Sequence, residues 1–242
     1  MPAAAPTIIA SSIGFDSRGR DPFAWDAGPI YDHAADRSGT VGTPRICYLA
    51  TAAGDHAGMI AGVYGALSPR FHLSHVTVFS MPNVDDVRGE FLGADVIWVG
   101  GGSVANLLAL WRVHGWDELL REAWQAGVVL GGVSAGSLCW HIGGTTDSFG
   151  PTLRPVTNGL AFLPYSNGVH YDSEAQRRPL LHALIGDGTL PGGYATDDGV
   201  ALVYEGTELV EVVADRPDCH GYRVSLEGGR VVEETLDTRR LR

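Results

Sequence analysis

The 242-residue sequence contains little cysteine, little positive charge and no long apolar run. Its three cysteines, Cys47, Cys139 and Cys219, are an odd number and lack metal-ligand spacing. Neither a disulfide framework nor a cysteine-based metal site is therefore expected. Cys47 and Cys139 lie in apolar stretches, which is typical of core thiols in a reducing compartment.

The charge balance is acidic, with 28 Asp and Glu against 17 Lys and Arg and a formal net charge of −11. This excess disfavours nucleic acid as a partner, because its phosphates would be repelled. No segment reaches the roughly 20 apolar residues that a membrane span needs. The first six residues lack the basic region and apolar core of a signal peptide. We therefore expect a cytoplasmic protein with no membrane partner, folded as a single domain over residues 1–242.

Strand-like and helical patterns alternate along the first half of the chain. The residue pattern predicts strands at residues 7–11, 45–51, 75–80 and 95–99, and in the apolar run 127–130 that leads to Ser134. It predicts helices at residues 56–67, 104–113 and 116–125. This order is typical of an α/β fold with a doubly wound, mostly parallel sheet and flanking helices. Ligands gather at the carboxyl ends of such strands, where the glycine triplet 100–102 and Ser134 both fall.

The pattern loosens after Ser134. A buried helix is predicted at residues 138–142, followed by a loop that opens at Thr145. Asp172 and Ser173 look like a cap for a helix over residues 174–184, interrupted at Pro179. The remaining apolar runs, at residues 199–204 and 208–213 and around Gly228 and Gly229, predict β-hairpins at the C-terminal end.

Residues 132–136 form a Gly-x-Ser-x-Gly motif around Ser134, at the predicted junction of a strand and a helix. Small neighbours allow a sharp turn there, which exposes the serine hydroxyl and aims the next amide, that of Ala135, at the same point. A nucleophile for acyl transfer needs this raised hydroxyl and a nearby amide for the oxyanion. A tight turn that merely contains serine would have the same sequence.

A serine nucleophile needs a base, and a histidine base needs a carboxylate to fix its tautomer. Two of the nine histidines are the best candidates for the base, His170 and His220, each in a predicted loop. The carboxylate candidates are Asp147, Asp172, Asp197 and Asp198. The orders Ser134–His170–Asp198 and Ser134–Asp198–His220 both satisfy the chemistry, and spacing alone does not decide between them.

Three sequence blocks resemble the peptidase E family of serine peptidases, which includes the cyanophycinases and has a fold like that of class I glutamine amidotransferases. The blocks are VGGGSVANLL at residues 99–108, GGVSAGS at 131–137 and LPYSNGVHYDSEAQRR at 163–178. A weaker fourth block, TDDGVAL, occupies residues 196–202. A glycine triplet about thirty residues before the serine turn disfavours the α/β-hydrolase fold, where the corresponding motif lies farther upstream.

The resemblance implies a role for several residues. Ser134 would be the nucleophile, His170 the base and Asp198 the third member, with Asp197 as the alternate. The amide of Gly101 or Gly102 would form the oxyanion hole with that of Ala135. Asp147 matches an acidic position near the family's active site, where it would hold a substrate ammonium group.

The chain departs from the family pattern at two positions. Ser103 replaces a common asparagine, which is a modest change. Glu174 stands where the aspartate-selective dipeptidases carry an arginine, and it would repel a substrate aspartate. Arg177 or Arg178 would have to compensate.

We therefore expect a serine exopeptidase that hydrolyses short peptides without a metal or other cofactor. A cyanophycinase-like hydrolase of an Asp-Arg polymer and a non-catalytic binding module are the alternatives. A glutamine amidotransferase is disfavoured, because it needs cysteine at position 134. The sequence leaves a homodimer open.

Overall fold

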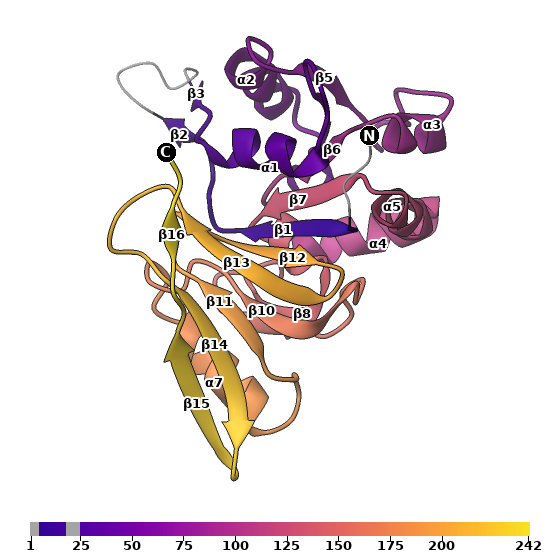
Figure 1. The fold of residues 1–242 in the computed structure, drawn as a ribbon. Helices are drawn as coiled ribbons and strands as arrows, with labels where there is room; N and C mark the ends of the chain where they lie inside the picture. Colours follow the sequence, from indigo (N-terminus) through magenta and orange to yellow (C-terminus); the bar gives the residue numbers. More distant parts are fainter. Residues whose placement is uncertain (1–4, 18–24) are drawn as a thin grey trace.

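The computed structural model describes residues 5–17 and 25–242. Most of the N-terminal segment that lacks a signal-peptide pattern lies outside these residues. An eight-stranded sheet forms the centre of the molecule (Figure 1). Its strands, in spatial order, are β16 (Arg239–Arg240), β13 (Glu208–Ala214), β12 (Val200–Glu205), β1 (Thr7–Ser11), β7 (Val129–Val133), β6 (Val96–Val99), β4 (Arg45–Leu49) and β5 (His72–His75).

The five strands from β1 to β5 in this order are parallel neighbours, and β12 joins the β1 edge antiparallel. Successive side chains point to opposite faces. Ile8 lies in the core on one face, and Ile9 lies in the core on the other. Helices α1 (Ile30–Ser38) and α2 (Ala57–Leu67) cover the Ile9 face, whereas α3 (Val87–Leu92), α4 (Val104–His114) and α5 (Trp116–Gln125) cover the Ile8 face. The predicted doubly wound α/β fold is confirmed.

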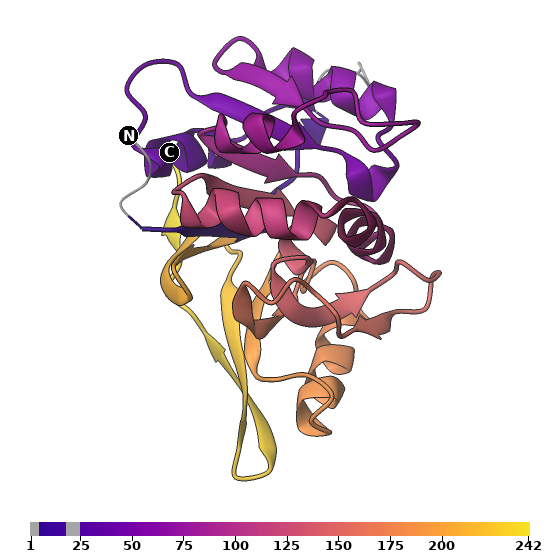
Figure 2. The ribbon, with the colours of Figure 1, turned by 90° about the vertical axis from the view of Figure 1, so that its right-hand side faces the viewer.

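A second sheet packs on the Ile8 side, below the large sheet in Figure 2. Leu163 and Val156 of this sheet share one apolar core with Tyr204 of β12. Helix α7 (Arg177–Gly186) packs against it, and the hairpin β14–β15 projects from it (Figure 1). Its six strands are, in order, β15 (Arg230–Thr235), β14 (Gly221–Glu227), β11 (Gly193–Thr196), β10 (Leu163–Gly168), β8 (His141–Thr146) and β9 (Arg154–Val156). A two-stranded ribbon, β2 (Asp16–Ser17) and β3 (Trp25–Asp26), completes the strands of the described residues.

Several predicted elements are wrong in detail. Residues 138–142 do not form a helix, because α6 (Ala135–Leu138) is a single turn and β8 begins at His141. The strand predicted at 75–80 is instead β5, which ends at His75. Pro179 does not interrupt α7, since it lies in the first turn, where proline is tolerated. Much of the loop expected before His170 is strand β10. No helix among the described residues is long and apolar enough to span a membrane.

Candidate active site

Ser134 lies at the end of β7, in the sharp turn between this strand and α6. Its backbone has φ 57° and ψ −111°, a conformation that costs a non-glycine residue energy. Its amide donates to the Ser11 carbonyl at 3.0 Å, and its carbonyl accepts from the amides of Ser137 and Leu138, each at 2.9 Å. These bonds hold the strained residue in place.

Two glycines make this turn sterically allowed. A Cβ atom on Gly136 would lie 2.3 Å from the Val99 carbonyl oxygen, and one on Gly132 would lie 2.5 Å from the Gly136 carbonyl oxygen. Real Cβ atoms do not approach oxygen so closely. The two glycines of the motif are therefore required by the close approach of the turn to β6.

The glycine triplet ends the neighbouring strand β6 and lies beside Ser134. A Cβ on Gly101 would be 3.4 Å from Cβ and 3.9 Å from Oγ of Ser134. Gly102 has φ 135°, and a Cβ there would collide with the Ala52 carbonyl. In the described part of the chain, no loop, turn or cap carbonyl accepts from the amides of Gly101, Gly102 or Ala135. These amides therefore have no backbone acceptor of that kind among the described residues.

His170 and Asp198 are in direct contact. Nδ1 of His170 lies 2.5 Å from Oδ1 of Asp198, and both side chains are partly exposed, at 23% and 29%. His170 has φ 54° and follows β10, whereas Asp198 lies in the turn between β11 and β12. Because Asp198 occupies Nδ1, the other ring nitrogen, Nε2, is left for a second partner.

Ser12 connects His170 to the end of the strand beside the Ser134 turn. It follows β1, whose last residue, Ser11, is in register with Val133 of β7. The Ser12 hydroxyl accepts from the His170 amide at 3.2 Å and lies 2.7 Å from Oγ1 of Thr196. His170 is thereby tied to the end of β1, the strand next to β7.

The two adjacent aspartates have different environments. Partial burial raises the pKa of Asp198, but the hydrogen bonds from His170 and Ser173 and the charge of Arg216 outweigh this effect and lower it. Burial raises the pKa of Asp197, whose Oδ2 accepts from the His220 amide and the Tyr222 hydroxyl, both at 3.0 Å. The ion pair with histidine thus falls to Asp198, and Asp197 faces β14.

Two other candidates from the sequence have different contacts. His220 is exposed, and its backbone bonds to Asp197 rather than to the serine turn. Asp172 does not cap α7, because its Oδ1 accepts from the Asp198 amide at 2.8 Å. It therefore helps to fix the turn that carries Asp198.

A comparison with protein families now adds to this geometry. The model of peptidase family S51 matches residues 27–212, which is most of the chain. Of the site residues described above, five lie outside this match: Ser11, Ser12, Arg216, His220 and Tyr222. The chain belongs to peptidase family S51. It is accordingly a serine-type peptidase, and the resemblance to peptidase E is confirmed.

Individual relatives of this S51 peptidase agree with the family match. The uncharacterized peptidase YgaJ of Bacillus subtilis (strain 168) is 42% identical over 199 residues, which cover 82% of this chain and 85% of that protein. Peptidase E of Shewanella denitrificans is 30% identical over 141 residues, 54% of this chain and 60% of that protein. The crystal structure of a peptidase from an acI-B1 Actinobacterium has the same fold, with a TM-score of 0.65 at 18% identity, covering 97% and 95% of the two chains.

The residues expected to bind substrate in this S51 peptidase are only partly accessible. Asp147 is exposed directly after β8. Arg177 is 2% exposed, and its guanidinium donates to Glu174 at 2.8 Å and to the Thr145 carbonyl. Arg178 contacts the rings of both Tyr171 and Tyr222 and pairs with Glu233 at 3.1 Å. Arg177 is thus buried and partnered, whereas the side chains of Arg178 and Glu174 are each 42% exposed.

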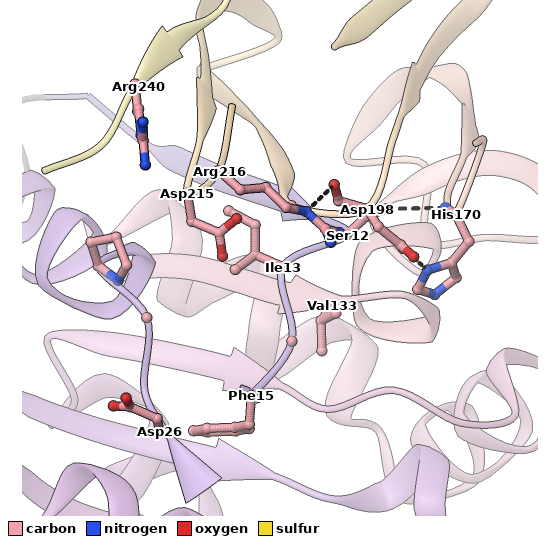
Figure 3. Close-up of a pocket in the computed structure, with 14 residues that line it drawn as sticks. Ser12, Ile13, Phe15, Asp26, Val133, His170, Asp198, Asp215, Arg216 and Arg240 are labelled. Atoms are coloured by element: carbon pink, nitrogen blue, oxygen red, sulfur yellow. Dashed lines mark hydrogen bonds and ion pairs between the residues drawn. The ribbon is translucent and has the colours of Figure 1, made fainter. Parts of the chain in front are cut away.

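Sequence reasoning missed three residues of the site. Ser12 could have been found, because it directly follows a predicted parallel strand. Arg216, whose Nε donates to the Asp198 carbonyl at 2.9 Å, and Tyr222 carry no signal in the sequence. Ser12, His170, Asp198 and Arg216 line one side of a cavity of about 580 Å³ (Figure 3).

Proposed function

We propose that this S51 peptidase is a serine exopeptidase that cleaves short peptides with Ser134, His170 and Asp198 as its catalytic triad. The observation that carries the proposal is the 2.5 Å contact between His170 Nδ1 and Asp198 Oδ1. The amide of His170 is hydrogen-bonded to Ser12, and the nearby turn at Ser134 has the backbone geometry of a nucleophile elbow.

The proposed reaction follows from this arrangement. Asp198 fixes the tautomer of His170, so that Nε2 accepts the proton of the Ser134 hydroxyl as Oγ attacks the scissile carbonyl. The amides of Ala135 and the glycine loop stabilise the oxyanion. His170 then donates its proton to the leaving amine, and water releases the acyl group with His170 as the base.

An exopeptidase also needs a group that recognises a chain end. Arg177 links the segment before Asp147 to α7 through Thr145 and Glu174. The two accessible carboxylates, Asp147 and Glu174, therefore belong to adjoining segments. We infer that one of them binds the α-ammonium group of the substrate, because a carboxylate pairs well with a cation.

Hydrolysis of a dipeptide library tests the proposal. The library contains Asp-X, Glu-X, Ala-X and Arg-X dipeptides and β-Asp-Arg. Wild type is expected to cleave at least one member, and Ser134→Ala is expected to lose activity by on the order of 10⁴-fold or more without unfolding. Ser225→Ala, in the distant β14, is the matched control and retains full activity. Equal turnover by wild type and Ser134→Ala would exclude Ser134 as the nucleophile.

Paired variants assign the other two members. Asp198→Asn should lower kcat/KM by on the order of 10³- to 10⁴-fold, because the histidine tautomer is no longer fixed. Asp197→Asn should cost about tenfold or less, since asparagine retains an oxygen for the His220 amide and the Tyr222 hydroxyl. His170→Ala should abolish activity that His220→Ala retains. The reverse result in either pair would reassign that role.

A further inference from the structure

The cavity beside the His170–Asp198 pair lies on a defined side of Ser134. Strand β7 has β6 on one side and β1 on the other. The glycine triplet extends from β6, whereas Ser12, Ile13 and Gly14, which line the cavity, extend from β1. The cavity and the oxyanion-binding loop therefore lie on opposite sides of the serine.

The inference rests on the proposed triad of Ser134, His170 and Asp198. With that triad, the position of the cavity decides which part of the substrate it can hold. The carbonyl oxygen of a bound peptide must point at the glycine loop. The leaving amine must lie against His170, which protonates it. The residue released after cleavage therefore leaves on the β1 side, where the cavity lies.

Arg216 is the cation of this cavity nearest to the catalytic pair. Its Nε donates to the Asp198 carbonyl at 2.9 Å, which fixes the direction of the side chain. It lies close to Gly199, where an added Cβ would be 2.4 Å from Nε of Arg216 and 2.7 Å from Oδ1 of Asp215. Figure 3 shows the guanidinium between Asp198 and Ser12, with Arg240 at the far end of the cavity.

We propose that this cavity binds the leaving residue and that Arg216 binds its free α-carboxylate. The Nη atoms of a guanidinium held at Nε suit a carboxylate, because they present parallel N–H donors. A longer peptide or an amide offers no carboxylate at this distance from the scissile bond.

The other charges of the cavity are compatible with this ligand. Asp215 and Asp26 line the part of the cavity away from His170 (Figure 3). The proton from His170 releases the amino acid as a neutral amine, which takes up a second proton from water, so that the product carries both a carboxylate and an ammonium group. A cavity with both signs of charge suits such a zwitterion better than a purely anionic ligand.

Matched acid and amide substrates test the role of Arg216. The substrates are Asp-Leu, Ala-Leu and Arg-Leu, each as the free acid and as the C-terminal amide. Wild type is expected to favour the acid in kcat/KM by about tenfold or more, and Arg216→Gln to lose about 10- to 100-fold on acids only. Arg230→Gln, at the start of β15 in the projecting hairpin, is the control that changes neither rate.

Equal losses on acid and amide would overturn the proposal, because Arg216 would then act only through Asp198. Equal rates of wild type on acid and amide would also overturn it. If wild type and Ser134→Ala cleave none of the substrates, the proposed function fails instead. In that case calorimetric titration of the free amino acid tests separately whether the cavity binds a carboxylate through Arg216. Leucine should bind wild type more tightly than leucinamide, and Arg216→Gln should remove the difference; no difference in wild type contradicts the subsite.

Discussion

At the scale of single residues, the strained turn at Ser134 depends on neighbouring residues that have no side chain. Gly136 has no side chain, and the backbone of β6 occupies the place where a Cβ would be. The obstacle is a carbonyl in the sheet, which cannot rotate away as a side chain can. A single methyl group at this position must therefore move either the turn or the strand.

Gly136→Ala is expected to destabilise the protein by about 3 kcal/mol and to reduce activity further by displacing Ser134. The exposed Gly65 in α2 is the matched control, because a Cβ there meets no atom within 4 Å. Gly65→Ala should stabilise the protein by about 0.5–1 kcal/mol through helix propensity. Urea unfolding of both variants measures the difference. Equal stability of the two would contradict the packing argument.

The residue scale is also where sequence reasoning worked best and then reached its limit. The Gly-x-Ser-x-Gly motif predicted a strained turn because only glycine tolerates such contacts. The choice between Asp197 and Asp198 could not be made, because adjacent residues in a loop can each face either way. The structure separates them by their partners, His170 for Asp198 and β14 for Asp197.

At the scale of elements, the β14–β15 hairpin is coupled to the loops that carry His170 and Asp198. Arg178 of α7 packs against both Tyr171 and Tyr222, with its carbon Cζ 4.6 Å and 4.8 Å from the two ring centres. Glu233 of β15 accepts from the Tyr171 hydroxyl at 2.9 Å and pairs with Arg178 at 3.1 Å. Tyr171 directly follows His170, so the hairpin buttresses the histidine loop.

Tyr222→Phe tests this coupling, because it removes only the hydroxyl that binds Asp197. We expect a loss of about 1 kcal/mol in stability and a severalfold lower kcat at unchanged KM, since the turn bearing Asp198 loses one support. Tyr64→Phe removes a comparable 2.9 Å contact with His75, far from the site, and should leave kcat unchanged. A kcat for Tyr222→Phe equal to that of wild type would mean that the hairpin has no positioning role.

Element prediction failed where tertiary context decides the structure. The glycine-rich segment at residues 141–146 has no strand periodicity, yet it forms β8 because β9 and β10 supply its hydrogen-bonding partners. Gly143 and Gly144 are needed there, since added Cβ atoms would lie 2.0 Å from carbonyl oxygens of Val156 and Asn167. Strand β8 could not be predicted from propensity for this reason, whereas the hairpin around Gly228 and Gly229 and the apolar strands of the large sheet could.

At the scale of the whole molecule, the two sheets meet around a buried histidine. His141 begins β8, is fully buried, and has its ring 5.9 Å from that of Tyr204 in β12. Its Nδ1 donates to the Ser137 carbonyl at 2.9 Å. Burial lowers its pKa to about 4, although this hydrogen bond raises it in part. The histidine is therefore neutral in the folded protein at neutral pH.

This lowered pKa predicts a dependence of stability on pH. Below about pH 6.5 His141 binds a proton in the unfolded chain, whereas in the folded protein it stays neutral down to about pH 4. Stability is therefore lost as pH falls through this window, by roughly 2 kcal/mol between pH 7 and pH 5. His141→Gln should lack this part of the loss. Urea unfolding of both proteins at the two pH values measures it, and parallel behaviour would contradict the assignment.

The central claim is that Ser134 is a nucleophile activated by His170, and covalent labelling tests it most directly. A fluorophosphonate should add one phosphonate group per chain, and fragmentation of the modified peptide should locate it on Ser134. The label should be absent from Ser134→Ala and should form far more slowly in His170→Ala, while His220→Ala labels like wild type. Labelling of another serine in a catalytically active enzyme, or Ser134 labelling that does not depend on His170, would contradict the account.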